Sequence, residues 1–532
     1  MKPIAVNSND FPSIIRDGQV YVDKTAYFHA LVTDPQRKYF FLARPRRFGK
    51  TLMISTLKAI FAGRRELFAG LAIDKTDYDG KRYPVLAFNF GQVSSSSLDV
   101  FKSSFPDYVA NVLTLAGFKY ESSETPGNNL GMAIEALAAD SDSGQVVVLI
   151  DEYDDPVAKS LKDMEQAKAV RDILADFYAQ LKDRTGAVKF LMMTGVSKFT
   201  KMSVFSTLSN MTDISFDERY ATMLGYTDEE LDAYFEEHMH VQAEKMGLDF
   251  SEYRRQLKWW YNGFRFVRRD TTTLYNPISL AMTLACPEEE FAATWTETGR
   301  PSMLMNYLDR VNLVEAMSPE NLATVEESEF DVSNLDSLKP IGMLFQTGYL
   351  TIKGYDPATR FYTLDVPDEE IRRDVALLLV DAMAGAEPGW GARLGGRLRA
   401  ADWPAFFAGL VSLYAKMCYG SMEGRVHEYS YARILHTLLM SQGMAVRQEE
   451  TSASGRSDIV AEYAGGVFIF ELEIDGTVED AFAQIDKKGY AVPYTASGRP
   501  VWAVALIFDN ETRRLVDAKA RQMVEPAGKE TR

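Results

Sequence analysis

The junction at residues 40–57, FFLARPRRFGKTLMISTL, constrains the fold of this chain more than any other stretch. Apolar residues at 38–43 predict a buried strand, and 49–63 has the apolar spacing of a helix that ends in glycine. A loop between a strand and a helix binds phosphate because free backbone N–H groups at the helix N-terminus face the anion. The junction therefore predicts an α/β domain with a nucleotide site.

Within this loop, Lys50 and Thr51 carry the chemistry that a triphosphate requires. A lysine at this position reaches the β- and γ-phosphates, and the hydroxyl that follows it ligates Mg²⁺. Gly49 permits an approach of the backbone that a Cβ would obstruct. The first glycine of the usual pattern is replaced by Arg44, and Pro45, with its fixed φ, offers another way to make the turn. A basic turn that contains Gly-Lys-Thr by chance is the alternative.

A second signal is the segment VVVLIDEYDD, which places Asp151 and Glu152 at the end of an apolar strand. One carboxylate at the carboxyl end of a strand can hold Mg²⁺, and the next can polarise the attacking water. Alone, the segment could equally be a buried strand followed by a solvated acidic turn. Together with Lys50 and Thr51, in this order along the chain, it predicts a site for ATP and Mg²⁺ with Glu152 as the catalytic residue.

A third strand, predicted at 188–195, ends near two hydroxyl groups, those of Thr194 and Ser197. Both are candidates to sense the γ-phosphate, and an ordinary glycine turn is the alternative. Four cations near these segments could stabilise transition-state charge or simply line a solvated face. They are Arg46, Arg47, Lys198 and Lys201.

The first 215 residues alternate strands with helices. Strands are predicted at 38–43, 83–90, 145–154 and 188–195, and the longer helices at 98–117, 129–140 and 156–184. Continuous apolar strands that alternate with helices imply a parallel sheet covered on both faces. We therefore expect an α/β domain at 1–215, a mostly helical region with a β-hairpin (348–366) at 216–415, and a mixed α/β domain at 416–532.

Composition limits the class of protein. The chain has 532 residues, too many for one core, and a net charge of −17, which argues against a generally basic surface but not against a local basic groove. Only Cys286 and Cys418 occur, so no disulfide framework or cysteine metal site is predicted. We expect no secretory signal, and no apolar run approaches the ~18 residues that cross a bilayer. These features favour a cytoplasmic protein with no membrane partner.

The third region brings acidic residues onto neighbouring predicted strands. GRSDIVAEYAGGVFIFELEI places Asp458 at the start of one strand (457–463) and Glu471 near the end of the next (467–474), with a glycine pair for the hairpin. Two such carboxylates can share Mg²⁺, which positions a water for attack on a phosphodiester. Glu428, on the helix predicted at 428–442, could add a third oxygen. The remaining elements expected here are strands at 444–449 and 501–508 and a helix at 477–490.

Ordered blocks run along nearly the whole chain: YVDKT, RPRRFGKT, LIDEYD, TGVSKF, WYNGF, LYNPISL, TGYLTI and GRSDIV…FIFELE. With them the chain resembles the AAA-ATPase-like family of bacterial proteins that carry a C-terminal PD-(D/E)XK nuclease-like domain. The resemblance implies an ASCE-type P-loop sheet, a helical lid and a restriction-endonuclease-like domain, with YVDKT near the adenine. It makes RPRRFGK the usual loop, so the expected nucleotide-binding residues are Arg44, Arg47, Phe48, Gly49, Lys50, Thr51, Asp151, Thr194 and Ser197.

The resemblance also bears on the C-terminal site. Gln484 and Tyr490, in AFAQIDKKGY, resemble the QI…Y pattern of the helix that faces the nuclease site in that family. The nuclease pattern has a lysine two residues after the second carboxylate, and here that position is Glu473, which would repel a phosphate. Lys487 or Lys488 could reach the centre instead, Glu473 could be a further metal ligand, or the domain could be inactive and only bind.

Two functions follow from the sequence. The first is a Mg²⁺-dependent ATPase whose nucleotide state controls a nuclease-like module that acts on or binds nucleic acid. Its catalytic residues would be Glu152, Asp458, Glu471, Glu428, Gln484 and Lys487, with metal ligands Thr51, Asp151, Asp458 and Glu471. The alternative is a nucleotide-switched interaction or scaffold protein with an inactive nuclease-like domain. Both are compatible with an oligomer.

One aromatic segment, Trp259 to Phe266, has two interpretations. Aromatic rings beside Arg255 and Arg265 could stack on the bases of a single strand. Packing within the protein is the more common use of such clusters, and we favour it here.

Overall fold

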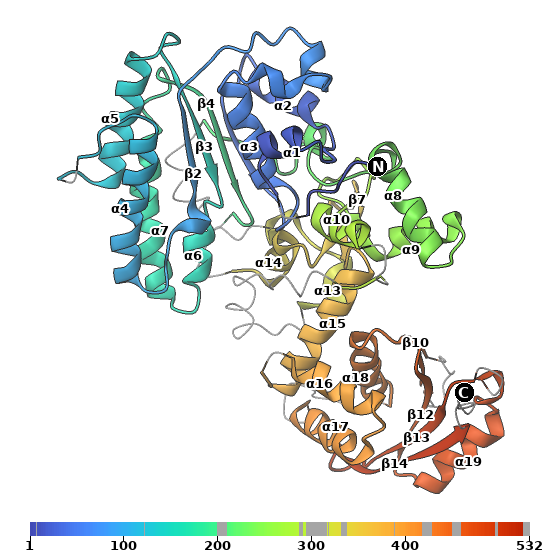
Figure 1. Cartoon of the computed structure of the whole chain (residues 1–532). Helices are drawn as coiled ribbons and strands as arrows, with labels where there is room; N and C mark the ends of the chain where they lie inside the picture. Colours follow the sequence, from blue (N-terminus) through green and yellow to red (C-terminus); the bar gives the residue numbers. More distant parts are fainter. Residues whose placement is uncertain are drawn as a thin grey trace. The chain divides into compact units, whose positions relative to one another are not determined.

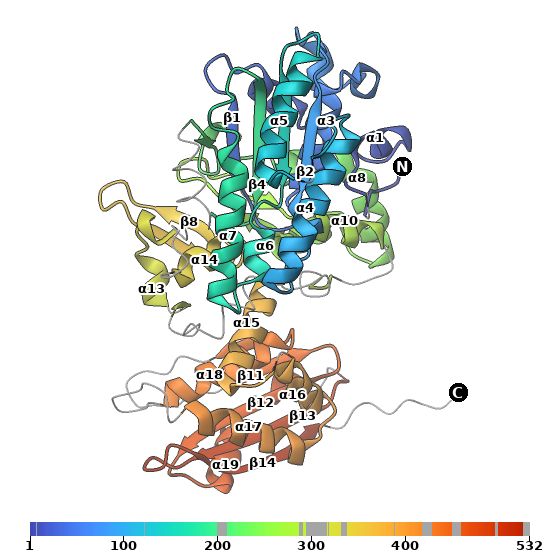
Figure 2. The same ribbon diagram turned by 90° about the vertical axis from the view of Figure 1, so that its left-hand side faces the viewer.

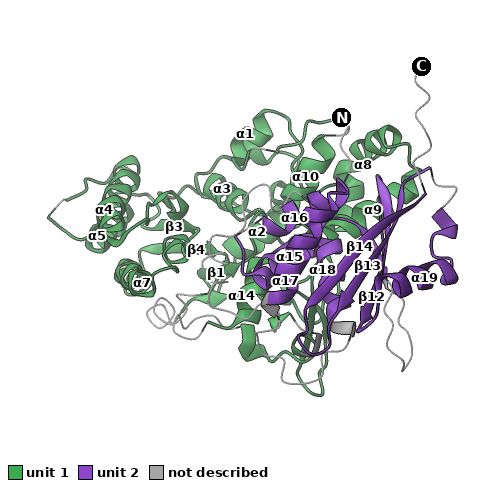
Figure 3. Cartoon of the chain, turned by 90° about the horizontal axis from the view of Figure 1, so that it is seen from below, with its two compact units in different colours: residues 1–370 green, residues 371–532 purple. Residues whose placement is uncertain are grey.

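The computed structural model describes the chain except for residues 7, 122, 199–209, 287–290, 294–315, 318, 331–337, 388, 418–427, 449–458, 495–497 and 525–532. The chain forms two compact units, Met1–Glu370 and Ile371–Arg532, which Figure 3 shows in different colours. The three-part division of the chain after residues 215 and 415 stays a prediction.

The first unit is built on a five-stranded sheet in the order β2-β3-β4-β1-β5, in which all neighbours are parallel. This order confirms the expected parallel α/β fold and places β4 between the loop strand and the acidic strand, as in the ASCE type. Four of the strands were predicted, whereas β5 is too short to leave a pattern. The strands are β1 (Tyr39–Ala43), β2 (Val85–Asn89), β3 (Val146–Asp151), β4 (Val188–Gly195) and β5 (Thr212–Asp213).

Helices cover both faces of this sheet (Figure 1). Alternate side chains of β1 enter opposite cores, Tyr39 and Phe41 on one face and Phe40 and Leu42 on the other. The first core is closed by α4 (Leu98–Leu115), α5 (Pro126–Ala139) and α7 (Met164–Ala179), the layer that faces the viewer in Figure 2. The second is closed by α1 (Phe11–Arg16), α2 (Thr25–Val32) and α3 (Lys50–Phe61).

The helix predicted at 156–184 is wrong as a single element. The structure has α6 (Asp155–Lys159), a break, and then α7. The break arises because the Asp163 side chain accepts the backbone N–H groups of Glu165 and Gln166, which caps a new helix.

The described residues in the rest of the first unit are mostly helical, with two small antiparallel sheets. The longest helix, α8, begins with a capping box between Thr227 and Glu230. The predicted hairpin at 348–366 is confirmed by β8 and β9. The elements are α8 (Asp228–Lys245), α9 (Phe250–Tyr261), β6 (Asn262–Phe264), β7 (Leu274–Tyr275), α10 (Pro277–Ala285), α13 (Pro319–Ala323), α14 (Pro340–Thr347), β8 (Thr351–Tyr355) and β9 (Tyr362–Asp365).

The packing interpretation of the aromatic segment is confirmed. Trp260, Tyr261, Phe264 and Phe266 are buried, whereas Trp259 is 55% exposed.

The second unit contains a five-stranded mixed sheet in the order β10-β11-β12-β13-β14, in which β12 and β13 are parallel and the other neighbours antiparallel. Tyr463 pairs with Gly466, so Ala464 and Gly465 form the hairpin turn. The predicted elements are confirmed, but the exposed strand β14, rich in charge, was not predicted. The strands are β10 (Ala445–Gln448), β11 (Ile459–Tyr463), β12 (Gly466–Ile474), β13 (Val501–Phe508) and β14 (Leu515–Val524).

The two faces of this sheet carry different helices (Figure 3). Phe468 and Phe470 of β12 pack in the core shared with α16 (Trp390–Arg399), α17 (Trp403–Met417) and α18 (Glu428–Ser441). Val467 and Ile469 pack against α19 (Val478–Lys488). Because side chains alternate along a strand, Glu471 and Glu473 belong to the α19 face. Helix α15 (Glu369–Ala384) carries the chain from the first unit into the second.

Among the described residues, no helix is both long enough and apolar enough to span a bilayer.

Candidate nucleotide site and C-terminal carboxylate site

The phosphate loop is a tight turn between β1 and α3. Two of its residues, Arg47 (φ 68°) and Gly49 (φ 87°), have left-handed backbone conformations. The Lys50 ammonium donates to the carbonyl oxygens of Arg44 and Pro45, both at 2.8 Å, so the lysine closes the loop on itself. Burial lowers the pKa of Lys50 to about 8, although the nearby carboxylates of Asp151, Asp154 and Glu152 oppose this shift.

The ends of β3 and β4 and the start of α3 meet at the acidic residue Asp151, which is 1% exposed. Thr51 at the start of α3 donates to its Oδ2 at 2.7 Å, and Thr194 at the end of β4 donates to its Oδ1 at 2.5 Å. The carboxyl ends of parallel strands are the usual ligand-binding edge of such a sheet. The Thr51 and Asp151 oxygens form the kind of donor set that Mg²⁺ prefers, so these residues fit the ion.

The Glu152 side chain diverges from that of Asp151. Its φ of 52° turns the chain directly after β3, and a Cβ placed on Gly91 would lie only 1.7 Å from Glu152 Oε2. Glycine at position 91 therefore makes room for this carboxylate. Burial raises the pKa of Glu152, and the negative charges of Asp151 and Asp155 add to this, while Lys50 and Arg46 oppose it.

Ser197 does not face the loop as a free hydroxyl. Its hydroxyl and its backbone N–H both donate to Asp154 Oδ2 at 2.6 Å, and the N–H of Val196 donates to Oδ1 at 3.2 Å. Asp154 thus joins the turn after β3 to the turn after β4. A Cβ on Gly195 would lie 2.5 Å from Asp154 Oδ1, which requires glycine there.

The other predicted cations have separate places. Lys198 donates to Asp213 at 2.7 Å, and Arg46 lies 3.4 Å from Asp155. Arg47 faces the cavity described below, and Glu370 is among the charges that act on it. Lys201 lies outside the described residues.

Arg44 does not line the cavity described below. Its guanidinium donates to the carbonyl oxygens of Ala43 and Ser215, at 3.0 and 2.7 Å, and lies 4.4 Å from the ring centroid of Phe266. Arg44 therefore braces the loop, which means that its guanidinium stabilises the backbone through these contacts and does not face the cavity.

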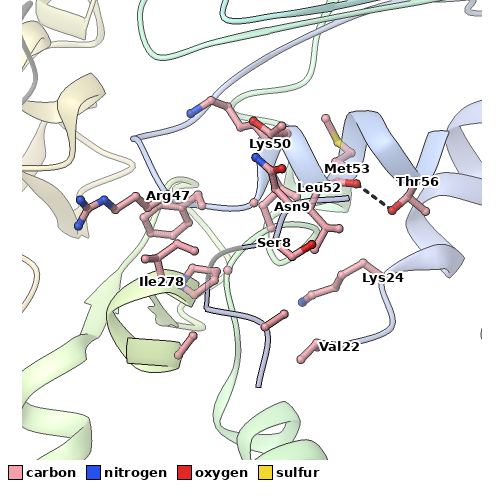
Figure 4. Close-up of a pocket in the computed structure, with 18 of the residues that line it drawn as sticks. Ser8, Asn9, Val22, Lys24, Arg47, Lys50, Leu52, Met53, Thr56 and Ile278 are labelled. Carbon is pink, nitrogen blue, oxygen red and sulfur yellow. Dashed lines mark hydrogen bonds between the residues drawn. The ribbon is translucent and has the colours of Figure 1, made fainter. Parts of the chain in front are cut away.

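A cavity of about 510 Å³ begins at the phosphate loop and continues between the N-terminal segment and α8 and α10. Its volume lies within the range of ligand pockets, roughly 300–1,000 Å³. Figure 4 shows that residues from three different segments line it, among them Lys50, Lys24 and Ile278. Its lining includes the charged residues Lys24, Arg46, Arg47, Lys50, Glu152, Asp155 and Lys159 and the apolar residues Ile4, Ala5, Val20, Val22, Leu224, Phe235, Ile278 and Ala281.

Lys24 was not among the predicted site residues, although YVDKT was noted as a block. Its ammonium donates to Thr222 O and pairs with Glu230, at 2.7 and 2.5 Å. Because Lys24 lines the cavity while paired with α8, it joins the N-terminal segment to the helical part of the unit. No motif reveals such a pair, since its members are 206 positions apart. Asp154 was also missed, for the same reason.

In the second unit, two carboxylates lie beside α19. The Gln484 amide donates to Glu471 Oε1 and, at 3.2 Å, to Glu473 Oε1. Lys488 Nζ lies 3.8 Å from Glu471 Oε1 and 5.3 Å from the Tyr490 ring centroid. Of the two predicted lysines, Lys488 thus approaches the carboxylates, although both lysines are exposed.

Part of the predicted C-terminal site lies beyond what the structure describes. Asp458 is outside the described residues, and Glu428 begins α18 but its side chain is not described. Glu471 is 1% exposed, and its Oε2 has no hydrogen-bond partner among the described atoms. No group of three His, Cys, Asp or Glu side chains in the described part of the chain could hold a metal ion.

A parallel sheet with a Gly-Lys-Thr loop, joined through Thr51 to an acidic strand, defines a P-loop nucleotide-binding domain. Sequence comparison agrees, since residues 3–205 match the family described as "Predicted AAA-ATPase" and residues 426–518 match the PD-(D/E)XK nuclease superfamily. The chain is also 33% identical over 527 residues to the "Uncharacterized protein in vnfD 5'region" of Azotobacter chroococcum mcd 1, covering 94% of this chain and 96% of that protein. The chain belongs to the AAA-ATPase-like family with a C-terminal PD-(D/E)XK nuclease-like domain, which confirms the resemblance.

Proposed function

We propose that the first unit binds and hydrolyses ATP with Mg²⁺. The observation that carries this proposal is the contact between Thr51 and Asp151, because it joins the helix of the phosphate loop to the acidic end of β3 within 2.7 Å. Lys50 begins the same helix, and the cavity beside it is lined by both charged and apolar residues, which suits the phosphates and the base of a nucleotide.

Each residue has a separate task in this proposal. Lys50 exchanges the carbonyls of Arg44 and Pro45 for the β- and γ-phosphates. Thr51 and Asp151 hold Mg²⁺, which, when bound, neutralises charge that develops on the phosphates. Glu152 accepts a proton from the attacking water, and its raised pKa suits a general base. Thr194 keeps Asp151 oriented through its hydrogen bond.

Calorimetric titration of MgATP into the full-length chain, with phosphate release measured in parallel, tests this proposal. We expect one nucleotide per chain and slow hydrolysis. Absence of binding at roughly 1 mM nucleotide, the upper end of ordinary KM values, would contradict it.

For the second unit we propose a nuclease-like module that acts on or binds nucleic acid near Glu471. The buried carboxylate and the Gln484 amide beside it support this proposal. A specific observation also favours the alternative, an inactive domain that only binds: Glu473 stands at the lysine position, and its carboxylate shares the Gln484 amide with Glu471.

Cleavage assays separate these two alternatives. Supercoiled, linear and single-stranded DNA and RNA are incubated with the full chain and Mg²⁺ or Mn²⁺. Cleavage that is lost in Asp458→Ala supports a nuclease. An inactive wild type that gains cleavage in Glu473→Lys supports a decayed centre, and an inactive Glu473→Lys supports a binding or scaffold role.

We also propose that the nucleotide state of the first unit controls nucleic-acid binding or cleavage by the second unit. We further propose that the protein acts in the cytoplasm. The continuous helix α15 provides a connection in the chain for this control. Nucleic-acid binding or cleavage, measured without nucleotide, with ATP and with ADP, should differ between the three conditions. Equal values in all three would contradict the control.

A further inference from the structure

Phe48, which the family resemblance includes among the nucleotide-binding residues, has an apolar ring that offers no hydrogen bond to a phosphate. Phe48 is completely buried, and it lies between Arg47 and Gly49, the two residues with positive φ. A left-handed conformation is unfavourable for a non-glycine residue, so Arg47 keeps it only where neighbouring structure holds the chain in place. Contacts that fix the Phe48 side chain therefore also fix the backbone turns at Arg47 and Gly49, and we call such contacts an anchor.

The anchor is an aromatic cluster from a distant part of the sequence. The Phe48 ring meets Phe264 edge-on at a centroid distance of 4.8 Å and Phe266 at 5.2 Å. Gly225 completes this seat, because a Cβ there would lie 3.2 Å from Phe48 Cε1. The Arg44 guanidinium also lies over the Phe266 ring, with its Cζ 4.4 Å from the ring centroid. The pair formed by Phe264 and Phe266 therefore contacts the loop at both Phe48 and Arg44.

The backbone around residue 265 presents both rings to the loop. The Phe264 and Phe266 rings lie side by side, with centroids 6.3 Å apart and planes inclined by 27°. Arg265, between them, is tied elsewhere: its N–H donates to Thr351 Oγ1 at 2.7 Å, its carbonyl accepts from the same hydroxyl at 3.0 Å, and its Nε donates to Val267 O at 3.0 Å. The two rings are therefore mounted on a fixed support.

We propose that Phe264 and Phe266 are positioning residues of the nucleotide site. They hold the phosphate loop through Phe48 and Arg44 and replace the first glycine of the usual loop as the means of setting its shape. The inference rests on the proposed ATP binding of the first unit. It explains why Arg44 at the first-glycine position is compatible with a phosphate site: the turn is braced from outside by a cation on a ring.

The consequence is specific to phosphate recognition. In the proposed site the backbone N–H groups of the loop would bind only the phosphates, so a loop that has lost its anchor should bind phosphates poorly while the rest of the cavity is retained. A purely structural role of the same rings predicts loss of stability without this selectivity.

The test compares Phe264→Leu and Phe266→Leu with two controls in the full-length chain. Trp259→Leu changes an exposed aromatic side chain of the same segment. Phe190→Leu changes a buried ring that packs on Phe40 and Phe61, within the core of the sheet. For each variant, MgATP and adenosine affinities are measured on the folded protein, and stability is measured by urea unfolding.

We expect Phe264→Leu and Phe266→Leu to weaken MgATP binding about tenfold or more, since the loss of one hydrogen bond to a charged phosphate is enough for such an effect, and to change adenosine binding less than about twofold. Trp259→Leu should leave both affinities unchanged, and Phe190→Leu should lower stability only. In the double variant Phe48→Leu/Phe264→Leu, the two losses should not add, because both remove one contact.

Three results would overturn the inference: parallel losses of ATP and adenosine affinity, a loss no larger than that of Phe190→Leu, or full additivity in the double variant. If the phenylalanine variants do not fold, Arg44→Lys, which keeps the charge but not the planar contact with Phe266, is measured with the same two ligands. Unchanged ATP affinity in that variant would then overturn it. A wild type that does not bind ATP would instead contradict the proposed function.

Discussion

The two acidic pairs of this chain differ in spacing, and the spacing decides how their charges are arranged. Asp151 and Glu152 are consecutive at the end of β3, so their side chains diverge. Asp151 accepts hydrogen bonds from the hydroxyls of Thr51 and Thr194, whereas the Glu152 carboxylate lies beside Gly91. Glu471 and Glu473 are two apart on β12, so both lie on one face and share the Gln484 amide. In the first pair, one carboxylate can bind the metal ion and the other can accept a proton. In the second pair, two negative charges lie close together, and a nearby cation would stabilise them.

The comparison is tested most severely at Lys50, the cation of the first site. Lys50→Ala should abolish detectable MgATP binding and hydrolysis, a loss of at least about 100-fold, because no other group replaces a buried ammonium among carboxylates. Calorimetry and phosphate release measure this effect. Lys58→Ala, which removes an exposed lysine from the same helix, is the matched control and should resemble the wild type. Hydrolysis at the wild-type rate in Lys50→Ala would remove the first site from the comparison.

Glu152 tests whether the consecutive pair truly divides its tasks. Glu152→Gln should lower kcat about 100- to 1,000-fold while MgATP still binds, because the amide cannot accept the proton of water. The carboxylate is the active form, and its pKa is raised, so hydrolysis in the wild type should increase as pH rises through a value above the ordinary 4.5. That limb of the pH profile should disappear in the variant. A variant that loses ATP binding together with hydrolysis would show that the two tasks are not separate.

These sites also differ in how far the sequence predicts them. The loop and its acidic partner are predictable because each follows its own strand, and parallel strands bring their ends together. Thr51 and Asp151 need only that rule. The brace made by Arg44 and Phe266, or the hydrogen bonds from Ser197 to Asp154, depend on side-chain directions that no periodicity records. For that reason the sequence predicts the position of Ser197 but not the partner of its hydroxyl.

On α19 the limit is finer. Gln484 and Lys488 are one helical turn apart, which makes them neighbours, but Lys487 is a neighbour of Gln484 at i+3 by the same rule. Only the packing of Ala481 and Ile485 against the sheet fixes the rotation of the helix and brings Lys488 near Glu471.

A smaller effect is expected from Thr194, which orients Asp151 without contacting nucleotide in the proposal. Thr194→Val keeps the shape of the side chain and removes the hydrogen bond at 2.5 Å. A hydrogen bond to a charged group contributes about 1.5–3 kcal/mol, so MgATP should bind roughly tenfold more weakly or worse. The loss should be much smaller for ATP with EDTA, because the hydroxyl acts through the metal ligand. Equal losses with and without Mg²⁺ would assign Thr194 to the phosphates instead.

The smallest effect concerns Lys488, the cation of the second site. It decides whether the neighbouring carboxylates of Glu471 and Glu473 bind a metal ion. Lys488 lies 3.8 Å from Glu471, so it competes with a metal ion for the same carboxylate. A unit charge near 4 Å contributes about 1 kcal/mol in a water-like medium, so Lys488→Gln should bind Mn²⁺ roughly fivefold more tightly. Lys487→Gln, one residue away and exposed, should leave Mn²⁺ affinity unchanged. If nucleic-acid cleavage falls in Lys488→Gln while Mn²⁺ affinity rises, Lys488 serves as the lysine that Glu473 displaced. If neither variant changes Mn²⁺ affinity, the carboxylates on β12 do not bind metal, and only the first acidic pair remains a metal site.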